Sequence, residues 1–133
     1  MIHGIGTDIV AIERIQAALA RHGERLLERV LSASERRDFD RLQPEVAAAW
    51  LAKRWAAKEA FGKALGTGVT APFTLAAIST AHSASGRPCF DLAPALSDVL
   101  RAHGVGRVSL SLADEQAYAI AFVVMECADD ADA

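Results

Sequence analysis

The feature that most constrains this chain is a long helix-forming stretch between two residues that favour helix ends. Pro44 suits the first turn of a helix, because its missing N–H would have no partner there. Gly66 suits the end, because glycine adopts the left-handed conformation at little cost. Alanine, leucine, lysine and glutamate, all strong helix formers, dominate between them. The sequence therefore predicts one long helix.

Large apolar residues give this predicted helix a broad apolar surface. They are Trp50, Leu51, Trp55, Phe61 and Leu65. A helix with so much apolar surface is expected to lie at the centre of the core.

The charges along the second half of the same stretch are unequal. Its cations are Lys53, Arg54, Lys58 and Lys63, and they oppose one acid, Glu59. Glu59 and Lys63 are four residues apart and so lie one turn apart on one face. A carboxylate can hold Mg²⁺, and a lysine one turn on can hold phosphate oxygens. The spacing alone favours an ordinary ion pair worth about 0.2–0.5 kcal/mol, whereas the position on a core helix favours a functional carboxylate.

The N-terminal residues 2–10 are β-branched and interrupted by glycine, which predicts a strand. Gly4 and Gly6 lack the third glycine of a dinucleotide-binding fingerprint, because Ile9 stands in its place. We interpret the two glycines as positions where another backbone or a ligand approaches closely. Asp8 is expected where the strand gives way to a helix, and from the residue type alone it is interpreted as a helix N-cap.

Composition describes one ordinary globular domain. The chain has 133 residues, of which 52% are hydrophobic and 23% charged, so a core large enough for independent folding is expected. No apolar run reaches the roughly 18 residues of a membrane span, and the N-terminal residues have no basic region followed by an apolar stretch, so a secretory signal is not expected. Cys89 and Cys127 are expected to be reduced thiols. The net charge of −3 argues against broad nucleic-acid binding.

The rest of the chain alternates between helical and strand-like patterns. A capping box at Ser32 and Glu35 predicts the start of a helix. A catalytic role for Glu35, close to a hydroxyl that reacts, is the less favoured alternative. Further expected helices span 11–22, 24–31 and 94–103, with Gly23 as a break. Expected strands span 73–80, 89–92, 107–112 and 118–125, with a turn at 83–88. The domain is expected over 1–126, followed by a short acidic tail at 127–133.

Two segments carry a family resemblance. The segment 54–68, R-W-A-A-K-E-A-F-G-K-A-L-G-T-G, resembles the motif R-[FW]-A-x-K-E-A-x-x-K-A-x-G-T-G of the holo-[acyl-carrier-protein] synthases, the small 4′-phosphopantetheinyl transferases. The segment 4–9, G-I-G-T-D-I, resembles the N-terminal G-[IL]-G-x-D-[IL] of the same family. The two motifs stand in the family's order and separation, and the similarity extends to about Met125.

The resemblance implies a fold, a reaction and partners. The fold would be the α+β fold of the 4′-phosphopantetheinyl transferases, with antiparallel strands packed on a long central helix. The reaction would transfer the 4′-phosphopantetheine group of coenzyme A to a serine of apo acyl carrier protein, for fatty acid biosynthesis. The family also implies a cytoplasmic homotrimer with active sites at subunit interfaces, acting without nucleic acid or membrane.

The resemblance also assigns roles to individual residues. The catalytic residues would be Asp8, Glu59 and Lys63, with Asp8 and Glu59 holding Mg²⁺. The residues expected to bind coenzyme A are Arg54, Lys58, Lys63, Gly66, Gly68, Arg87 and Pro88. Residues expected to dock the carrier protein are Arg14, Arg21 and Arg25, which form one stripe if the helical phase carries through Gly23.

One position departs from the family pattern, and two other functions remain open. Ser109 stands where the family has a histidine associated with the phosphate region of the coenzyme, and serine carries no charge. A Mg²⁺-dependent hydrolase of nucleotide pyrophosphates would use the same Asp8, Glu59 and Lys63. A carrier-protein-binding module that has lost its chemistry is the second alternative.

Overall fold

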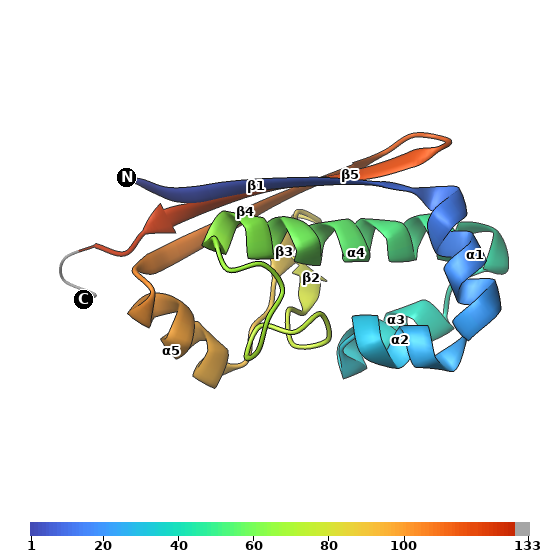
Figure 1. Ribbon diagram of the computed structural model, residues 1–133, viewed down its shortest axis with the longest axis horizontal. Coiled ribbons are helices and arrows are strands. Elements are labelled where there is room, and N and C mark those ends of the chain that lie inside the picture. The colour runs from blue at the N-terminus through green and yellow to red at the C-terminus, as the bar shows by residue number, and fades with distance from the viewer. Residues whose placement is uncertain (130–133) are drawn as a thin grey trace.

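A computed structural model describes residues 1–129, in which a three-stranded sheet lies along one long helix (Figure 1). This helix, α4, spans Pro44–Leu65, with its proline in the first turn and Gly66 in the left-handed conformation at its end (φ 91°). Both predicted ends are therefore confirmed. Leu51 and Phe61 of α4 are almost completely buried, so the helix forms the centre of the core as expected.

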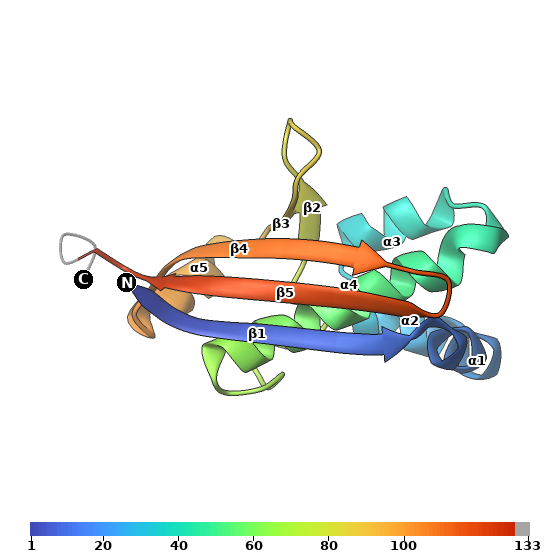
Figure 2. The ribbon, with the colours of Figure 1, turned by 90° about the horizontal axis from the view of Figure 1, so that it is seen from above.

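The sheet is antiparallel and has the order β1-β5-β4 (Figure 2). Its strands are β1 (Ile2–Ala11), β5 (Tyr118–Cys127) and β4 (Val105–Asp114). The last two, expected as strands over 118–125 and 107–112, pair as a hairpin. Since the N-terminal strand pairs with the C-terminal one, residues from opposite ends of the sequence lie side by side over α4.

Two glycines allow β1 to lie directly against α4. A Cβ built on Gly4 would stand 2.0 Å from the carbonyl oxygen of Ala64, and one on Gly6 would stand 2.0 Å from that of Ala60. No side chain larger than hydrogen fits at these distances. The expected close approach is confirmed, and the approaching group is the helix backbone. The same contact brings the strand position of Asp8 next to the last turns of α4.

The remaining elements surround the two ends of α4 (Figures 1 and 2). Three helices lie beyond its N-terminal half: α1 (Ile12–His22), α2 (Glu24–Val30) and α3 (Ala33–Asp40). A small hairpin of β2 (Thr80–His82) and β3 (Pro88–Phe90) projects beyond the β4 edge of the sheet. Helix α5 (Pro94–Ala102) lies near the N-terminus and the end of β5. The break at Gly23 and the capping box at Ser32 and Glu35 are confirmed.

Two local expectations were wrong. The strand expected over 73–80 is mostly a turn, because the carbonyl of Thr74 accepts from the N–H groups of Ala77 and Ile78 rather than from a neighbouring strand. Asp8 does not cap a helix, because β1 continues to Ala11 and α1 begins without a side-chain cap. The domain boundary after residue 126 stays a prediction. Of the expected tail at 127–133, residues 130–133 lie outside the described residues.

The face of the sheet that points away from α4 is apolar and exposed. Ile9 is 62% exposed on β1, and Phe122 is 45% exposed on β5. Ile5, Tyr118 and Ile120 are exposed on the same two strands. A small monomer seldom exposes so many large apolar side chains on one flat face. Within residues 1–129, no helix combines the length and the apolar character that crossing a bilayer would require.

Candidate active site

An acidic residue of β1 and a basic residue of α4 meet where the strand crosses the helix. The Nζ of Lys63 lies 3.2 Å from Oδ1 of Asp8 and donates to the carbonyl of Thr7 at 3.0 Å. The surface ion pair that spacing suggested between Lys63 and Glu59 is thus replaced by a contact between the two sequence motifs. The structure brings Asp8 and Lys63 together, as the resemblance implies.

Glu59 lies one turn before Lys63 and completes the cluster. Burial and the neighbouring Asp8 carboxylate raise the pKa of Glu59, whereas the charges of Lys63 and Arg29 oppose the rise. Within residues 1–129 the Glu59 carboxylate has no hydrogen bond and no ion pair. Two carboxylates that repel each other and lack enough donors are a suitable place for a divalent cation with oxygen ligands.

Arg29 is a residue of this region that the sequence reasoning missed. Its charge acts on Glu59, and its side chain lines two cavities. One, of about 310 Å³, lies against the loop of 69–75 that follows α4. The other, of about 200 Å³, also contains Arg25. Arg29 follows Arg25 by four residues on α2, so extending the predicted basic stripe by one turn would have found it.

Known proteins combine the same sequence motifs and fold. The family model described as the 4′-phosphopantetheinyl transferase superfamily matches residues 4–123. The chain belongs to this superfamily. A holo-[acyl-carrier-protein] synthase of Aromatoleum aromaticum is 52% identical over 126 residues, covering 95% of this chain and 98% of the relative.

Solved structures of holo-[acyl-carrier-protein] synthases have the same fold as this chain. The crystal structure of holo-[acyl-carrier-protein] synthase from Neisseria meningitidis has a TM-score of 0.89 at 44% identity, covering 95% of this chain and 99% of that one. A holo-(acyl-carrier-protein) synthase from Bacillus anthracis in complex with CoA (3′,5′-ADP) has a TM-score of 0.81 at 30% identity, with 96% and 99% covered. The predicted family, fold and enzyme class are thereby confirmed.

Lys58 of the superfamily motif is a correction to the coenzyme-binding set. Its side chain is 0% exposed, and its Nζ donates to Glu35 Oε1 and to the carbonyl of Val30, both at 2.5 Å. Burial lowers the pKa of Lys58, and the Glu35 carboxylate opposes this. A lysine enclosed in this way cannot meet a phosphate. Glu35 is equally buried, which also removes it from the reacting hydroxyl.

Gly66 and Gly68 are expected from the resemblance to bind coenzyme A, but their backbone N–H groups are already used within the chain. The N–H of Gly66 donates to the carbonyls of Gly62 and Lys63, and the N–H of Gly68 also donates to Gly62. Their backbone donors therefore close the end of α4. Both glycines have positive φ, at 91° and 71°. What they contribute is a turn of fixed shape beside Lys63, rather than a phosphate cradle made from their own N–H groups.

Arg54 is almost buried, at 6% exposed, and its guanidinium lies 4.3 Å above the ring centre of Trp50. Burial lowers the pKa of Arg54, and the carboxylates of Glu35 and Asp38 oppose this. Among the residues that the structure describes, its Nε has no hydrogen-bond partner. Arg54 thus points toward α3, away from the Asp8 cluster, with one donor unused.

Arg87 and Pro88 lie on the β2–β3 hairpin rather than in the Asp8 cluster. Arg87 is exposed, and its carbonyl accepts from the N–H of Ser83 in the predicted turn. Pro88 pairs with His82. The hairpin lies beyond the β4 edge, whereas Asp8 belongs to the opposite edge strand (Figure 2). Within one chain, the two groups of predicted residues therefore do not form one cluster.

The three predicted docking residues do not share one helix. Gly23, with φ at 50°, ends α1, and a new helix begins at Glu24. The condition for one continuous stripe is not met. Arg14 and Arg21 are exposed on α1, whereas Arg25 is exposed on α2.

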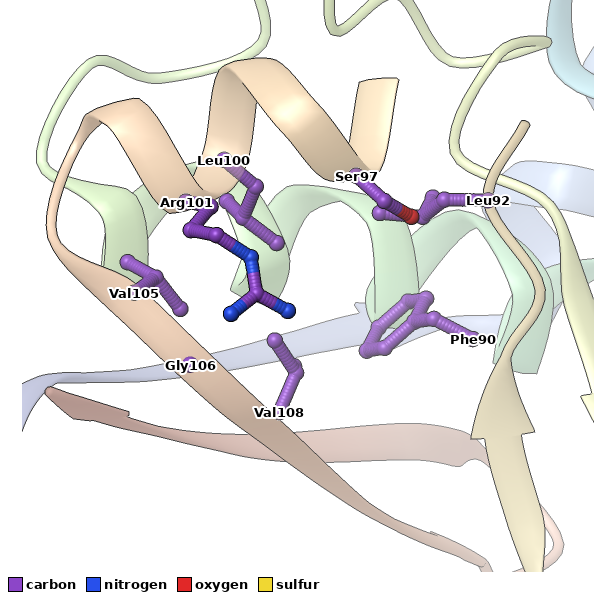
Figure 3. A pocket seen from close by; sticks show the side chains of 8 residues that line it. All are labelled: Phe90, Leu92, Ser97, Leu100, Arg101, Val105, Gly106 and Val108. Atoms are coloured by element: carbon purple, nitrogen blue, oxygen red, sulfur yellow. The ribbon is translucent and has the colours of Figure 1, made fainter. Parts of the chain in front are cut away.

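A further cleft, of about 230 Å³, lies between β3, α5 and β4 (Figure 3). Phe90 and Val108 form an apolar wall, and the side chain of Arg101 extends between them and α5. None of the residues assigned to catalysis, coenzyme or docking lines this cleft, so it is separate from the candidate active site.

Proposed function

We propose that this chain transfers the 4′-phosphopantetheine group of coenzyme A to a serine of apo acyl carrier protein in cytoplasmic fatty acid biosynthesis. Adenosine 3′,5′-bisphosphate is the other product. The observation that carries the proposal is the convergence of Asp8, Glu59 and Lys63 from two distant motifs. The names of the relatives, and the coenzyme bound in one solved structure, support it.

We infer that Asp8 and Glu59 hold Mg²⁺. The unpaired Glu59 carboxylate and its repulsion by Asp8 fit a divalent cation. Among residues 1–129, no group of three or more histidine, cysteine, aspartate or glutamate side chains is placed to hold a metal. Phosphate oxygens and waters would therefore complete the octahedral shell that Mg²⁺ prefers. Bound there, Mg²⁺ would neutralise charge on the transferred phosphate and on the leaving oxygen.

The protein residues act mainly by positioning and charge. The Nζ of Lys63 is held by Thr7 and Asp8, and we assign this ammonium group to an oxygen of the pyrophosphate. The serine oxygen forms a bond to phosphorus, and the bond from phosphorus to the oxygen of adenosine bisphosphate breaks. We assign the serine proton to a water oriented by one of the two carboxylates. Orientation of the reactants supplies much of the rate.

At the nucleotide end we assign the exposed Arg87 and the neighbouring Pro88 to coenzyme A. Arg54 belongs to the same proposal. Its buried Nε lacks a hydrogen-bond acceptor among the described residues, and a phosphate oxygen could supply one. Its guanidinium would have to leave the Trp50 ring to reach one.

Weighing the carrier protein tests the proposed function. The enzyme is incubated with apo acyl carrier protein, coenzyme A and Mg²⁺, and the carrier is then measured by mass spectrometry. A gain of one phosphopantetheine on the serine supports the proposal. Loss of coenzyme A with no gain by the carrier would indicate the pyrophosphate hydrolase. Binding of the carrier without any product would indicate the non-catalytic module.

Reversing the charge of Arg14 is expected to weaken carrier-protein docking. The side chain is exposed on α1, and a basic face attracts an acidic partner by complementary charge. We expect Arg14→Glu to raise the KM for carrier protein about tenfold or more and to leave the KM for coenzyme A within about twofold. Arg37→Glu, at an exposed position of α3, is the control. Equal rises in both KM values would contradict the docking role.

Restoring the family histidine at Ser109 is expected to strengthen coenzyme binding. Ser109 is exposed on β4, and a histidine there could supply a charge-assisted hydrogen bond to phosphate, which serine cannot. We expect Ser109→His to lower the KM for coenzyme A by about three- to tenfold. Ser111→His, at the next exposed position of the strand, should have no such effect. An unchanged KM in Ser109→His would show that no phosphate comes near this position.

We propose a homotrimer whose subunits meet through the exposed face of the sheet. Burying a side chain such as Phe122 stabilises an assembly by about 1.5–3 kcal/mol. Ser109 belongs to the same sheet, so a partner's ligand could reach it. Active sites would lie at the interfaces between subunits.

A further inference from the structure

A buried carboxylate that the proposed chemistry does not use joins several elements of the fold. One oxygen of Glu35 accepts from Lys58 Nζ at 2.5 Å and from the N–H of Ser32 at 2.9 Å. The other accepts from the N–H and hydroxyl of Thr80, at 3.0 and 2.6 Å. Lys58 Nζ also donates to the carbonyl of Val30 at 2.5 Å. We call these residues the Glu35 hub.

The hub connects segments that are distant in sequence. It joins the end of α2 at Val30, the start of α3 at Ser32, the middle of α4 at Lys58 and the start of β2 at Thr80. Glu35 is 1% exposed and Lys58 is 0% exposed, so both charges have been removed from water. Every oxygen of the carboxylate is satisfied, which removes the large penalty of an unpaired buried charge.

Stability alone is a poor reason for such a pair. Removing two buried charges together, in favour of apolar residues of similar volume, is often neutral or stabilising, because desolvation offsets the attraction. Directional hydrogen bonds add something that apolar contacts lack, which is a single relative arrangement of the groups they join. The hub therefore specifies how α2, α3, α4 and β2 are placed relative to one another.

Two of the elements that the hub joins carry residues of the proposed site. On α4, Lys58 follows Arg54 by one turn, and Arg54 is assigned to the nucleotide end of coenzyme A. Thr80 begins β2, and the partner strand β3 begins at Pro88, next to Arg87. The hairpin has only three residues in each strand, and a two-stranded ribbon this short is not stable by itself. Its position therefore depends on contacts with the rest of the fold, among them the hydrogen bonds of Thr80 to Glu35 and the packing of Phe90 against Phe61 of α4.

We propose that Glu35 is a positioning residue that fixes the β2–β3 hairpin, and with it Arg87, relative to the Arg54 and Lys58 side of α4. The inference rests on the proposed function, because it assigns the hairpin to the nucleotide end of coenzyme A. A hairpin free to shift would bind that end less tightly. It would alter the chemical step little once coenzyme A is bound, since Asp8 and Lys63 do not contact the hub.

The most selective test removes one hydrogen bond of the hub. Thr80→Val keeps the shape and the branched side chain but removes the hydroxyl that donates to Glu35. We expect the Kd and the KM for coenzyme A to rise about three- to tenfold, with kcat within about twofold and the KM for carrier protein unchanged. Ile78→Val, at a fully buried position two residues earlier, is the control for a simple loss of stability and should leave the KM unchanged.

A second variant replaces the charges as a pair. Glu35→Leu combined with Lys58→Met removes both buried charges together. Cooperative thermal unfolding checks that it folds, because the N–H groups of Ser32 and Thr80 lose their acceptor. We expect coenzyme A to bind at least about tenfold more weakly, and the amides of the hairpin to exchange with solvent faster than in the parent protein. Coenzyme A binding within twofold of the parent in both Thr80→Val and the double variant would overturn the positioning role.

Calorimetry of coenzyme A binding separates this inference from the proposed function. If the unaltered protein binds no coenzyme A, the proposed function is wrong and the inference falls with it. If the unaltered protein binds and the hub variants bind equally well, only the inference is wrong. A fall in kcat with no change in Kd would likewise assign the hub to general stability.

Discussion

Glu59→Gln is expected to reduce phosphopantetheinyl transfer by about a thousandfold and at the same time to raise the melting temperature of the metal-free protein. The loss follows from removing one of two carboxylates that hold the cation, since losing about 4 kcal/mol of transition-state stabilisation slows a reaction about a thousandfold. The gain follows from the pKa of Glu59, which burial and the Asp8 carboxylate raise. A neutral glutamine avoids both unfavourable effects, and an increase of about 1–3 °C is expected.

Calorimetry with and without Mg²⁺ checks both parts of this prediction. A ligand that binds only the folded state raises its melting temperature, so Mg²⁺ should stabilise the parent protein and not Glu59→Gln. Asp8→Asn should lose transfer to the same extent without gaining stability, because Asp8 also forms an ion pair with Lys63. Glu45→Gln, in the first turn of the same helix, is the control. Transfer above a tenth of the parent rate at limiting Mg²⁺ would disprove the assignment of Glu59.

The parts of the fold that local sequence controls were predictable. Pro44 and Gly66 act on the backbone of their own segment, and the structure begins and ends α4 where they stand. Gly4 and Gly6 predicted that another group approaches the backbone of β1 closely, although the sequence did not identify that group as the backbone of α4. The prediction of a strand over 73–80 was wrong, because the apolar residues of this segment, among them Phe73 and Ile78, are buried in the core although they belong to a turn. Periodicity cannot separate these two ways of burying side chains.

Within the site, the sequence could not decide which charged residues of α4 are structural and which are functional, because these residues point in different directions from one helix. Lys58 and Glu59 are adjacent in sequence but about 100° apart around α4. Lys58 follows Arg54 by one turn, on the side that faces the buried Glu35, whereas Glu59 is influenced by Asp8. The motif alone presents both as charged residues of one helix. Only the packing of α3 and β1 on opposite sides of α4 decides which of them is structural.

The Gly66 turn shows a second reason why motif residues are assigned wrongly. Glycines that follow a basic helix resemble a phosphate-binding loop, but a helix end must also satisfy its own last carbonyls. Here Gly66 and Gly68 donate to Gly62 instead. A built Cβ on Gly62 would stand 2.6 Å from the backbone of Gly68, so that glycine, which the sequence reasoning passed over, is the one that the turn requires.

Phe122→Arg is expected to convert the proposed trimer into a monomer and to reduce transfer about a hundredfold or more. The side chain lies on the central strand of the sheet, on the exposed face that also carries Ile5 and Ile9. Arginine at an exposed position of a monomer costs little, whereas three unpaired charges buried at one interface are expensive to desolvate. Sedimentation velocity measures the state of assembly, and the transfer assay measures the activity at the same protein concentration.

Val46→Arg is the matched control, because Val46 is also an exposed apolar residue but lies in the first turn of α4, away from the sheet face. It should remain assembled and active. A folded Phe122→Arg monomer with full activity would show that each chain contains a complete site, and it would remove the reason for placing Ser109 near a ligand bound by a neighbouring subunit. A parent protein that sediments only as a monomer would reject the trimer itself. Loss of activity together with loss of assembly, in a variant that still unfolds cooperatively, is the result that an interface site requires.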